Sequence, residues 1–83
     1  MYEVKLLPSG QRDLEDLPHS IFPRIEKAIK NLKQNPRPMG CIKLTGEEGY
    51  RIRVGTYRIL YRIDDGKKEV FIYRVKHCRE AYR

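Results

Sequence analysis

Residues 50–64 have the sequence YRIRVGTYRILYRID, in which two alternating runs flank the dipeptide Gly55-Thr56. Alternation of apolar and polar residues is typical of strands that bury one face, and a short glycine-containing turn between two such runs predicts a β-hairpin. With Gly55-Thr56 as the turn, Arg53 pairs with Arg58 and Ile52 pairs with Ile59. One face then carries the side chains of Tyr50, Ile52, Val54, Tyr57, Ile59, Tyr61 and Ile63. The opposite face carries Arg51, Arg53, Arg58 and Arg62.

The pair of arginines that face each other is the informative feature of this hairpin. Like charges directly opposite destabilise a sheet, so a sequence selected only for stability would avoid the pair. The planar guanidinium group can hold a phosphate by two hydrogen bonds. We therefore predict an anion site, the arginine patch, formed by Arg51, Arg53 and Arg58. A solvated sheet face with scattered charges is the plainer alternative.

A second hairpin is predicted from Asp65-Gly66, a dipeptide that favours a two-residue type I′ turn. It leads into a last strand at residues 70–75. The resulting register pairs Arg62 with Glu69, which explains Arg62 as an ion-pair partner. The other pairs that it implies are Arg58 with Tyr73 and Leu60 with Phe71.

The clearest helix is predicted at residues 18–35, where apolar residues recur at the spacing of one helical face. Ser20 is its expected N-cap, Pro23 falls in its first turn, and the sequence Asn35-Pro36-Arg37-Pro38 ends it. The weaker elements are a strand at residues 2–7, a break at 8–10, a short helix at 11–17, a strand at 41–44 and a polar loop at 45–49. This order predicts an α+β fold: an N-terminal strand, then two helices packed on one face of a mainly antiparallel sheet of four or five strands.

The composition limits the classes of partner. The chain has 83 residues, with 18 Lys and Arg against 11 Asp and Glu, and so a formal charge of +7. This length predicts a single domain over residues 1–83. The basic excess favours nucleic acid first, and an anionic membrane or an acidic protein second. Nothing resembles a signal peptide, and no apolar run could span a bilayer, so we expect a cytoplasmic protein with reduced cysteines.

Few residue clusters suggest catalysis or cofactor binding. His19, Cys41, His77 and Cys78 lack the spacing of metal ligands, so we expect no metal and no cofactor. Imidazole exchanges protons readily near neutral pH, which makes His77 the candidate for proton transfer. We expect the tail of the chain to bring His77 and Tyr82 to the edge of the arginine patch.

Several segments together resemble the RelE/ParE toxin superfamily of toxin–antitoxin systems. They are Lys43-Leu44-x-Gly46, YRIRVGTYR at residues 50–58, NPRP at 35–38 and VKHCREAYR at 75–83. The resemblance implies a fold like that of microbial ribonucleases. For RelE-type members it implies a toxin that cuts mRNA in the ribosomal A site, by attack of a ribose 2′-OH on the adjacent phosphate without a metal, and so inhibits translation.

The resemblance also implies roles for individual residues. The basic residues of the family's third strand match Arg51 and Arg53, and the arginine of the next strand matches Arg58. Tyr82 matches a tyrosine that stacks on a base, which is a common way to hold unpaired RNA. The further residues that we assign to RNA contacts are Lys43, Tyr73 and Arg79.

Two departures from the family pattern affect the proton-transfer groups. Some members have lysines where this chain has Arg51 and Arg53. Arginine stays protonated, so it can clamp phosphate but is a poor base, and the role of base then falls to His77 or to no residue. The family tail has arginine directly after the histidine position, where this chain has Cys78 followed by Arg79.

The implied partners are a cognate antitoxin, the ribosome and mRNA, with no membrane. A surface of charge +7 suits an acidic, partly helical antitoxin segment. Two other functions remain open on the same fold. One is a ParE-type toxin that inhibits DNA gyrase without cutting RNA, and the other is an RNA-binding module without catalysis.

Overall fold

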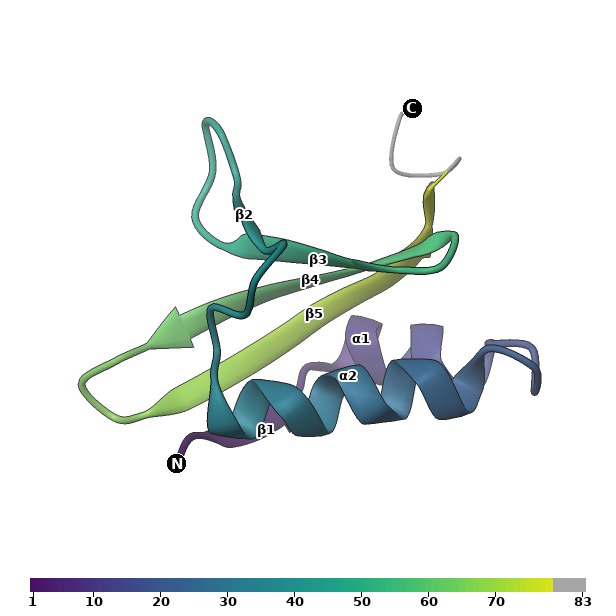
Figure 1. Cartoon of the computed structure of the whole chain (residues 1–83), viewed down its shortest axis with the longest axis horizontal. Coiled ribbons are helices and arrows are strands. Elements are labelled where there is room, and N and C mark those ends of the chain that lie inside the picture. The colour runs from purple at the N-terminus through teal and green to yellow at the C-terminus, as the bar shows by residue number, and fades with distance from the viewer. Residues whose placement is uncertain (79–83) are drawn as a thin grey trace.

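A computed structural model describes residues 1–78 of the chain as an α+β fold with one five-stranded sheet, which confirms the predicted class. The elements in chain order are β1 (Glu3–Leu6), α1 (Pro8–Glu15), α2 (Phe22–Gln34), β2 (Ile42–Lys43), β3 (Tyr50–Val54), β4 (Tyr57–Asp64) and β5 (Glu69–His77). The strand order is β1-β5-β4-β3-β2, with β1 parallel to β5 and every other pair antiparallel. Both helices lie on one side of the sheet, and α2 runs along that face (Figure 1). No helix within residues 1–78 is long and apolar enough to cross a membrane.

The core lies between α2 and the helix-covered face of the sheet, which we call the inner face. Ile25 and Leu32 of α2 are fully buried there, against the strand residues Ile52, Ile59, Tyr61, Val70, Ile72 and Val75. The residues predicted for the apolar face of the first hairpin all belong to this core or pack against it. Burial of each large apolar side chain stabilises the fold by about 1.5–3 kcal/mol.

Helix α1 begins three residues earlier than expected, because Pro8-Ser9-Gly10 forms its first turn instead of a break. Proline suits the first position of a helix, where its missing N–H has no intrahelical acceptor to bond. The N–H of the preceding Leu7 donates to the carbonyl of Ile72 at 2.9 Å, and Ser9 Oγ donates to the carbonyl of Tyr73 at 2.7 Å. These bonds fix the start of α1 against β5.

Helix α2 begins at Phe22, with Ile21 as its N-cap and no side-chain capping bond. The expectation that Ser20 caps this helix is therefore wrong. Pro23 does lie in the first turn, as expected, and the helix ends at Gln34 before the Asn-Pro-Arg-Pro sequence. The residues before Ile21 form turns instead of helix, which shortens the predicted range of 18–35 at its start.

The first hairpin has the predicted register: Arg53 pairs with Arg58 and Ile52 pairs with Ile59. Local sequence decides this register, because the turn at Gly55-Thr56 joins the strands directly. Gly55 has a φ of 61°, a conformation that glycine adopts without strain.

The second hairpin differs from the prediction in two ways. Its loop has four residues, 65–68, because Asp64 pairs with Glu69 and Lys68 adopts a left-handed φ of 54°. Asp64 Oδ1 accepts the N–H of Lys67 at 3.0 Å and stabilises this longer loop. In addition, Tyr73 is an extra residue in β5, a β-bulge opposite the Leu60–Tyr61 step.

These two differences correct the predicted pairs. The observed pairs are Arg58 with Lys76, Leu60 with Arg74 and Arg62 with Phe71. Glu69 therefore does not pair with Arg62. Its carboxylate instead lies 2.6 Å from Nζ of Lys5 on the neighbouring β1.

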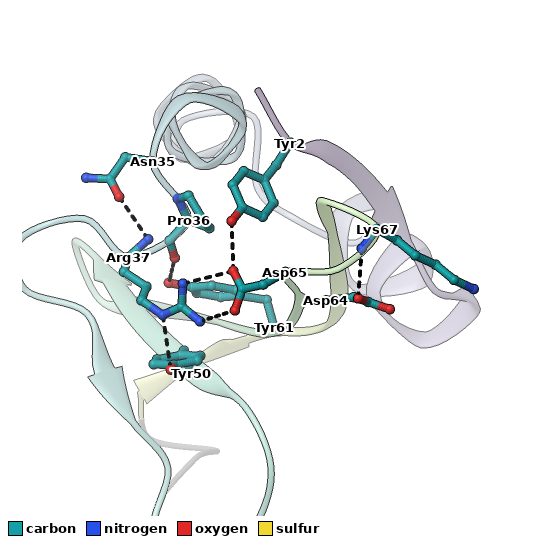
Figure 2. Close-up of polar contacts among 9 residues, drawn as sticks. All are labelled: Tyr2, Asn35, Pro36, Arg37, Tyr50, Tyr61, Asp64, Asp65 and Lys67. Carbon is teal, nitrogen blue, oxygen red and sulfur yellow. Dashed lines mark hydrogen bonds and ion pairs between the residues drawn. The ribbon is translucent and has the colours of Figure 1, made fainter.

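A polar cluster of Tyr2, Arg37, Tyr50 and Asp65 joins distant parts of the chain (Figure 2). Arg37 forms two hydrogen bonds with the Asp65 carboxylate, of 2.8 and 3.2 Å, and its Nε donates to the Tyr50 hydroxyl at 3.2 Å. The Tyr2 hydroxyl donates to Asp65 at 2.7 Å. The bonds from Arg37 and then from Tyr2 lower the pKa of Asp65 to about 2. The cluster ties the α2–β2 connection to the β4–β5 loop.

Candidate nucleic-acid interface

The outer face of the sheet, which points away from the helices, carries three cations in line across β3, β4 and β5. Arg53 pairs with Arg58, and Arg58 pairs in turn with Lys76. The flanking pair of Ile59 and Val75 belongs to the buried core, so the alternation of side chains places Arg58 and Lys76 on the outer face. We call Arg53, Arg58 and Lys76 the cation row.

The residues of the cation row differ in exposure and contacts. Arg58 is only 8% exposed and is the one buried charged residue within residues 1–78. Arg53 is exposed, and its Nε donates to the carbonyl of Gly55 at 3.1 Å, which holds the guanidinium beside the β3–β4 turn. The N–H of Cys78 donates to the carbonyl of Thr56 at 2.7 Å. The end of β5 is thereby fastened to the turn that carries Arg53.

A second row lies beside the first and contains Arg51 of β3, Leu60 of β4 and Arg74 of β5. Arg74 has a structural partner, because its Nε lies 2.8 Å from Asp13 Oδ2 of α1. The same carboxylate oxygen accepts the N–H of Val75 at 2.9 Å. No ion pair within residues 1–78 involves Arg51, which is half-buried next to Ile42 of β2. Arg51, Arg53 and Arg58 therefore share one face, as the sequence predicts.

Arg62 and Tyr73 occupy the other end of the outer face. The Arg62 guanidinium lies 5.6 Å from the centre of the Tyr73 ring, in a cation–π contact. Glu47 and Glu48 line the hollow beside them. Burial, and then the negative charge of Glu47, raise the pKa of Tyr73. The structure thus places Tyr73, which we assigned to RNA contacts, beside acidic residues and apart from the cation row.

His77 does not share the face of the arginine patch. It pairs with Tyr57, and the two rings meet edge to face with centres 5.2 Å apart. Tyr57 packs against the core on the inner face. His77 lines a cleft of about 170 Å³ there, together with Asp13, Asp16, Leu17, Tyr57 and Val75. The bulge at Tyr73 is the cause, because one extra residue moves every later side chain of a strand to the opposite face.

Three predicted site residues remain: Lys43, Arg79 and Tyr82. Lys43 is exposed on the edge strand β2 and pairs with Tyr50, so it projects to the side of Tyr50 and away from the arginine patch. Arg79 and Tyr82 lie outside the described residues.

Among residues 1–78, no group of three or more His, Cys, Asp or Glu side chains could hold a metal ion. Cys41 and Cys78 are both free thiols.

Lys76 is the residue of this face that the sequence interpretation missed. The assumed two-residue turn placed Tyr73 opposite Arg58, whereas the longer loop and the bulge bring Lys76 there. The polar run of residues 64–69, DDGKKE, could have indicated the longer loop, since it accommodates a four-residue loop as readily as a two-residue turn.

The chemical capacity of the outer face follows from these contacts. The cation row presents three positive charges, and among residues 1–78 no acidic residue stands in the strand register opposite any of them. Guanidinium groups can hold phosphate oxygens through two hydrogen bonds each, and an ammonium group adds a compact charge. The face is therefore suited to bind a phosphate group and to stabilise additional negative charge on it.

Comparison with known proteins agrees with this fold. A family model described as "ParE toxin of type II toxin-antitoxin system, parDE" matches residues 4–82. Toxin RelG of Mycobacterium tuberculosis is 38% identical over 86 residues, which cover 99% of this chain and 97% of that protein. A chain of the toxin–antitoxin complex RelBE2 from the same organism is 35% identical with a TM-score of 0.82, over 92% of this chain and 96% of that chain. A chain of the archaeal RelE–RelB complex from Pyrococcus horikoshii is 27% identical with a TM-score of 0.77, over 92% and 93% of the two chains.

Proposed function

Since the chain belongs to the RelE/ParE family of toxins of type II toxin–antitoxin systems, we propose that it is an endoribonuclease that cuts mRNA on the ribosome and so stops translation. The observation that carries the proposal is the pairing of Arg53 with Arg58, with Arg51 on the same outer face. This pairing costs stability, and binding of a multiply charged phosphate compensates for it.

The proposed reaction breaks one phosphodiester bond of the RNA. The 2′-oxygen of a ribose forms a bond to the adjacent phosphorus, and the bond from phosphorus to the 5′-oxygen of the next nucleotide breaks. The 2′-hydroxyl loses a proton and the departing 5′-oxygen gains one, which leaves a 2′,3′-cyclic phosphate and a 5′-hydroxyl end. Negative charge accumulates on the phosphorane oxygens, where Arg51, Arg53 and Arg58 stabilise it. Loss of one such donor lowers a rate by about 10²–10³-fold, which corresponds to about 2.7–4 kcal/mol.

Proton transfer needs groups other than these arginines, because guanidinium does not deprotonate in proteins. His77, the residue that we expected to act as the base, faces the inner side of the sheet beside Tyr57. We therefore assign His77 a smaller contribution to the rate of RNA cleavage than the arginines. On this assignment, His77→Ala lowers the cleavage rate less than Arg58→Ala does.

The proposed partner that restrains the toxin is an antitoxin. The relatives from M. tuberculosis and P. horikoshii occur in complexes named for RelB and RelE. For this chain, a formal charge of +7 and an outer face rich in arginine favour an acidic antitoxin segment. Such a segment would neutralise the cation row and block access of RNA to it. We place this competition in the cytoplasm, where the ribosomes are.

The deciding experiment is cleavage of an mRNA in vitro, with and without programmed ribosomes. Arg58→Ala is the main variant, and Arg53→Ala is the second because Arg53 is exposed and its loss leaves the core unchanged. Lys30→Ala, on the exposed face of α2, is the matched control for loss of one positive charge. We expect a loss of about 10²–10³-fold for Arg58→Ala and near-normal cleavage for the control. Full cleavage by both arginine variants, with folding confirmed by circular dichroism, would exclude the outer face as the active site.

A second function is supported by the family model itself, whose description names ParE. A toxin of that type would inhibit DNA gyrase and leave RNA intact. Relaxation of plasmid DNA in expressing cells, with protein synthesis unaffected, would favour this function over cleavage of mRNA. Absence of toxicity would favour an RNA-binding module without catalysis.

A further inference from the structure

The outer face holds a cation that neither the sequence interpretation nor the proposed mechanism uses. Lys76 stands opposite Arg58 in the register of β4 and β5. We propose that Lys76 is a phosphate-binding residue of this site and completes a three-cation clamp on the RNA backbone with Arg53 and Arg58. The inference rests on the proposed function, since it deepens the same site.

The arrangement of the cation row lowers the stability of the sheet. Two pairs of like charges, Arg53 with Arg58 and Arg58 with Lys76, lie in one line across three strands. Each pair destabilises the sheet, by roughly 0.2–1 kcal/mol on the usual scale of cross-strand pairs. No ion pair within residues 1–78 relieves Lys76, although Arg74, two residues earlier, has Asp13. A polyanionic ligand relieves both pairs at once.

The spacing of the three strands suits a single phosphate group. Adjacent strands lie about 4.7–4.9 Å apart, so the first and third members of the row are separated by roughly 10 Å at the backbone. Arginine and lysine side chains are long enough to meet at one phosphate from these positions. Lys76 is half-buried, and the bond from the Cys78 N–H to Thr56 holds its end of β5 against the β3–β4 turn. The ammonium group is therefore presented from a fixed strand.

A plainer explanation is that Lys76 protects an edge. β1 pairs with β5 only as far as Ile72, and lysines on exposed strand edges discourage association between sheets. The two explanations differ in what Lys76→Glu does. A charge of either sign protects an edge, whereas a phosphate site requires a positive one. Glutamate at this position would also attract Arg58, so it should raise or preserve thermal stability while it weakens RNA binding.

The test uses the full chain and a short single-stranded RNA whose 2′-hydroxyls are all methylated, so that the proposed cleavage cannot occur. Binding is measured over a range of salt concentrations for wild type, Lys76→Gln, Lys76→Arg and Lys76→Glu, with Lys30→Gln as the control for loss of one exposed charge. Each phosphate contact contributes about 0.7 to the slope of log K against log salt for single strands. Lys76→Gln should lower the magnitude of this slope by about 0.7. Between 1 M and 0.1 M salt, the affinity of the variant should therefore rise about fivefold less than that of wild type. Lys76→Arg should restore both.

The outcomes separate this inference from the proposed function. A slope for Lys76→Gln equal to that of Lys30→Gln would overturn the assignment, as would wild-type protein that does not bind this RNA. A lower melting temperature for Lys76→Glu than for Lys76→Gln would also count against it, because relief of repulsion predicts the reverse. If wild type binds with the expected slopes but does not cleave mRNA on ribosomes, the cleavage proposal fails and Lys76 still stands as a phosphate-binding residue.

Discussion

Gly10 of α1 is buried close against the backbone of β5, and Gly10→Ala tests how tightly the two are packed. A Cβ atom at this position would lie 2.6 Å from the carbonyl oxygen of Ile72 and 3.2 Å from its carbonyl carbon. Backbone atoms cannot turn aside as a flexible side chain can, so α1 must move. In an unhindered helix the same change stabilises by about 0.5–1 kcal/mol. Forced overpacking costs about 1–3 kcal/mol, so the net effect is a destabilisation between about 0 and 2.5 kcal/mol.

The assay for Gly10→Ala is urea unfolding followed by circular dichroism. The control is Asn31→Ala on the exposed side of α2, where the substitution changes helix propensity alone and should stabilise by up to about 0.7 kcal/mol. The two alanine variants should therefore move the unfolding midpoint in opposite directions. A midpoint for Gly10→Ala at or above that of wild type would refute the close contact between Gly10 and Ile72.

Three further perturbations test the rest of the framework. Tyr61→Phe removes the buried hydrogen bond of 2.8 Å from the Tyr61 hydroxyl to the Pro36 carbonyl. The substitution should destabilise the protein by about 1–3 kcal/mol in the same urea assay. An unchanged midpoint would mean that solvent reaches that carbonyl. Gly49→Ala, at a φ of 126° and with a Cβ position 2.8 Å from the Tyr61 carbonyl oxygen, should cost about 1–3 kcal/mol; a neutral result would mean that this loop adjusts. The pKa of Asp65 is lowered from 3.8 to about 2 in the folded protein, so its stabilisation is present above pH 3.8 and is lost as the pH falls towards 2. Asp65→Asn should remove that part of the acid dependence of the melting temperature, and identical pH profiles for the two proteins would contradict it.

The features that the sequence predicts well are those that short segments decide. The alternation on both sides of Gly55-Thr56 is enough to pair Arg53 with Arg58, because a hairpin register follows from its turn. The buried face of α2 likewise follows from the spacing of its own apolar residues, such as Ile25 and Leu32.

The features that the sequence does not predict depend on contacts between distant segments. The start of α1 forms hydrogen bonds with β5 at Ile72 and Tyr73, where the β-bulge occurs. The residues that flank Tyr73 in the sequence do not predict this bulge. A single unpaired residue there exchanges the faces of all later residues of the strand. That exchange is why Lys76, and not His77, joins the arginines.

The parallel pairing of β1 with β5 sets the order in which the chain can be completed during its synthesis. Glu3 pairs with Glu69, so β1 leaves the ribosome long before its partner β5 and must wait for it. The β3–β4 hairpin can form earlier, since its contacts are local. The third cation of the row, Lys76, becomes available only with β5. A nascent chain therefore acquires the whole cation row only after β5 has been made, and products that stop before β5 lack it.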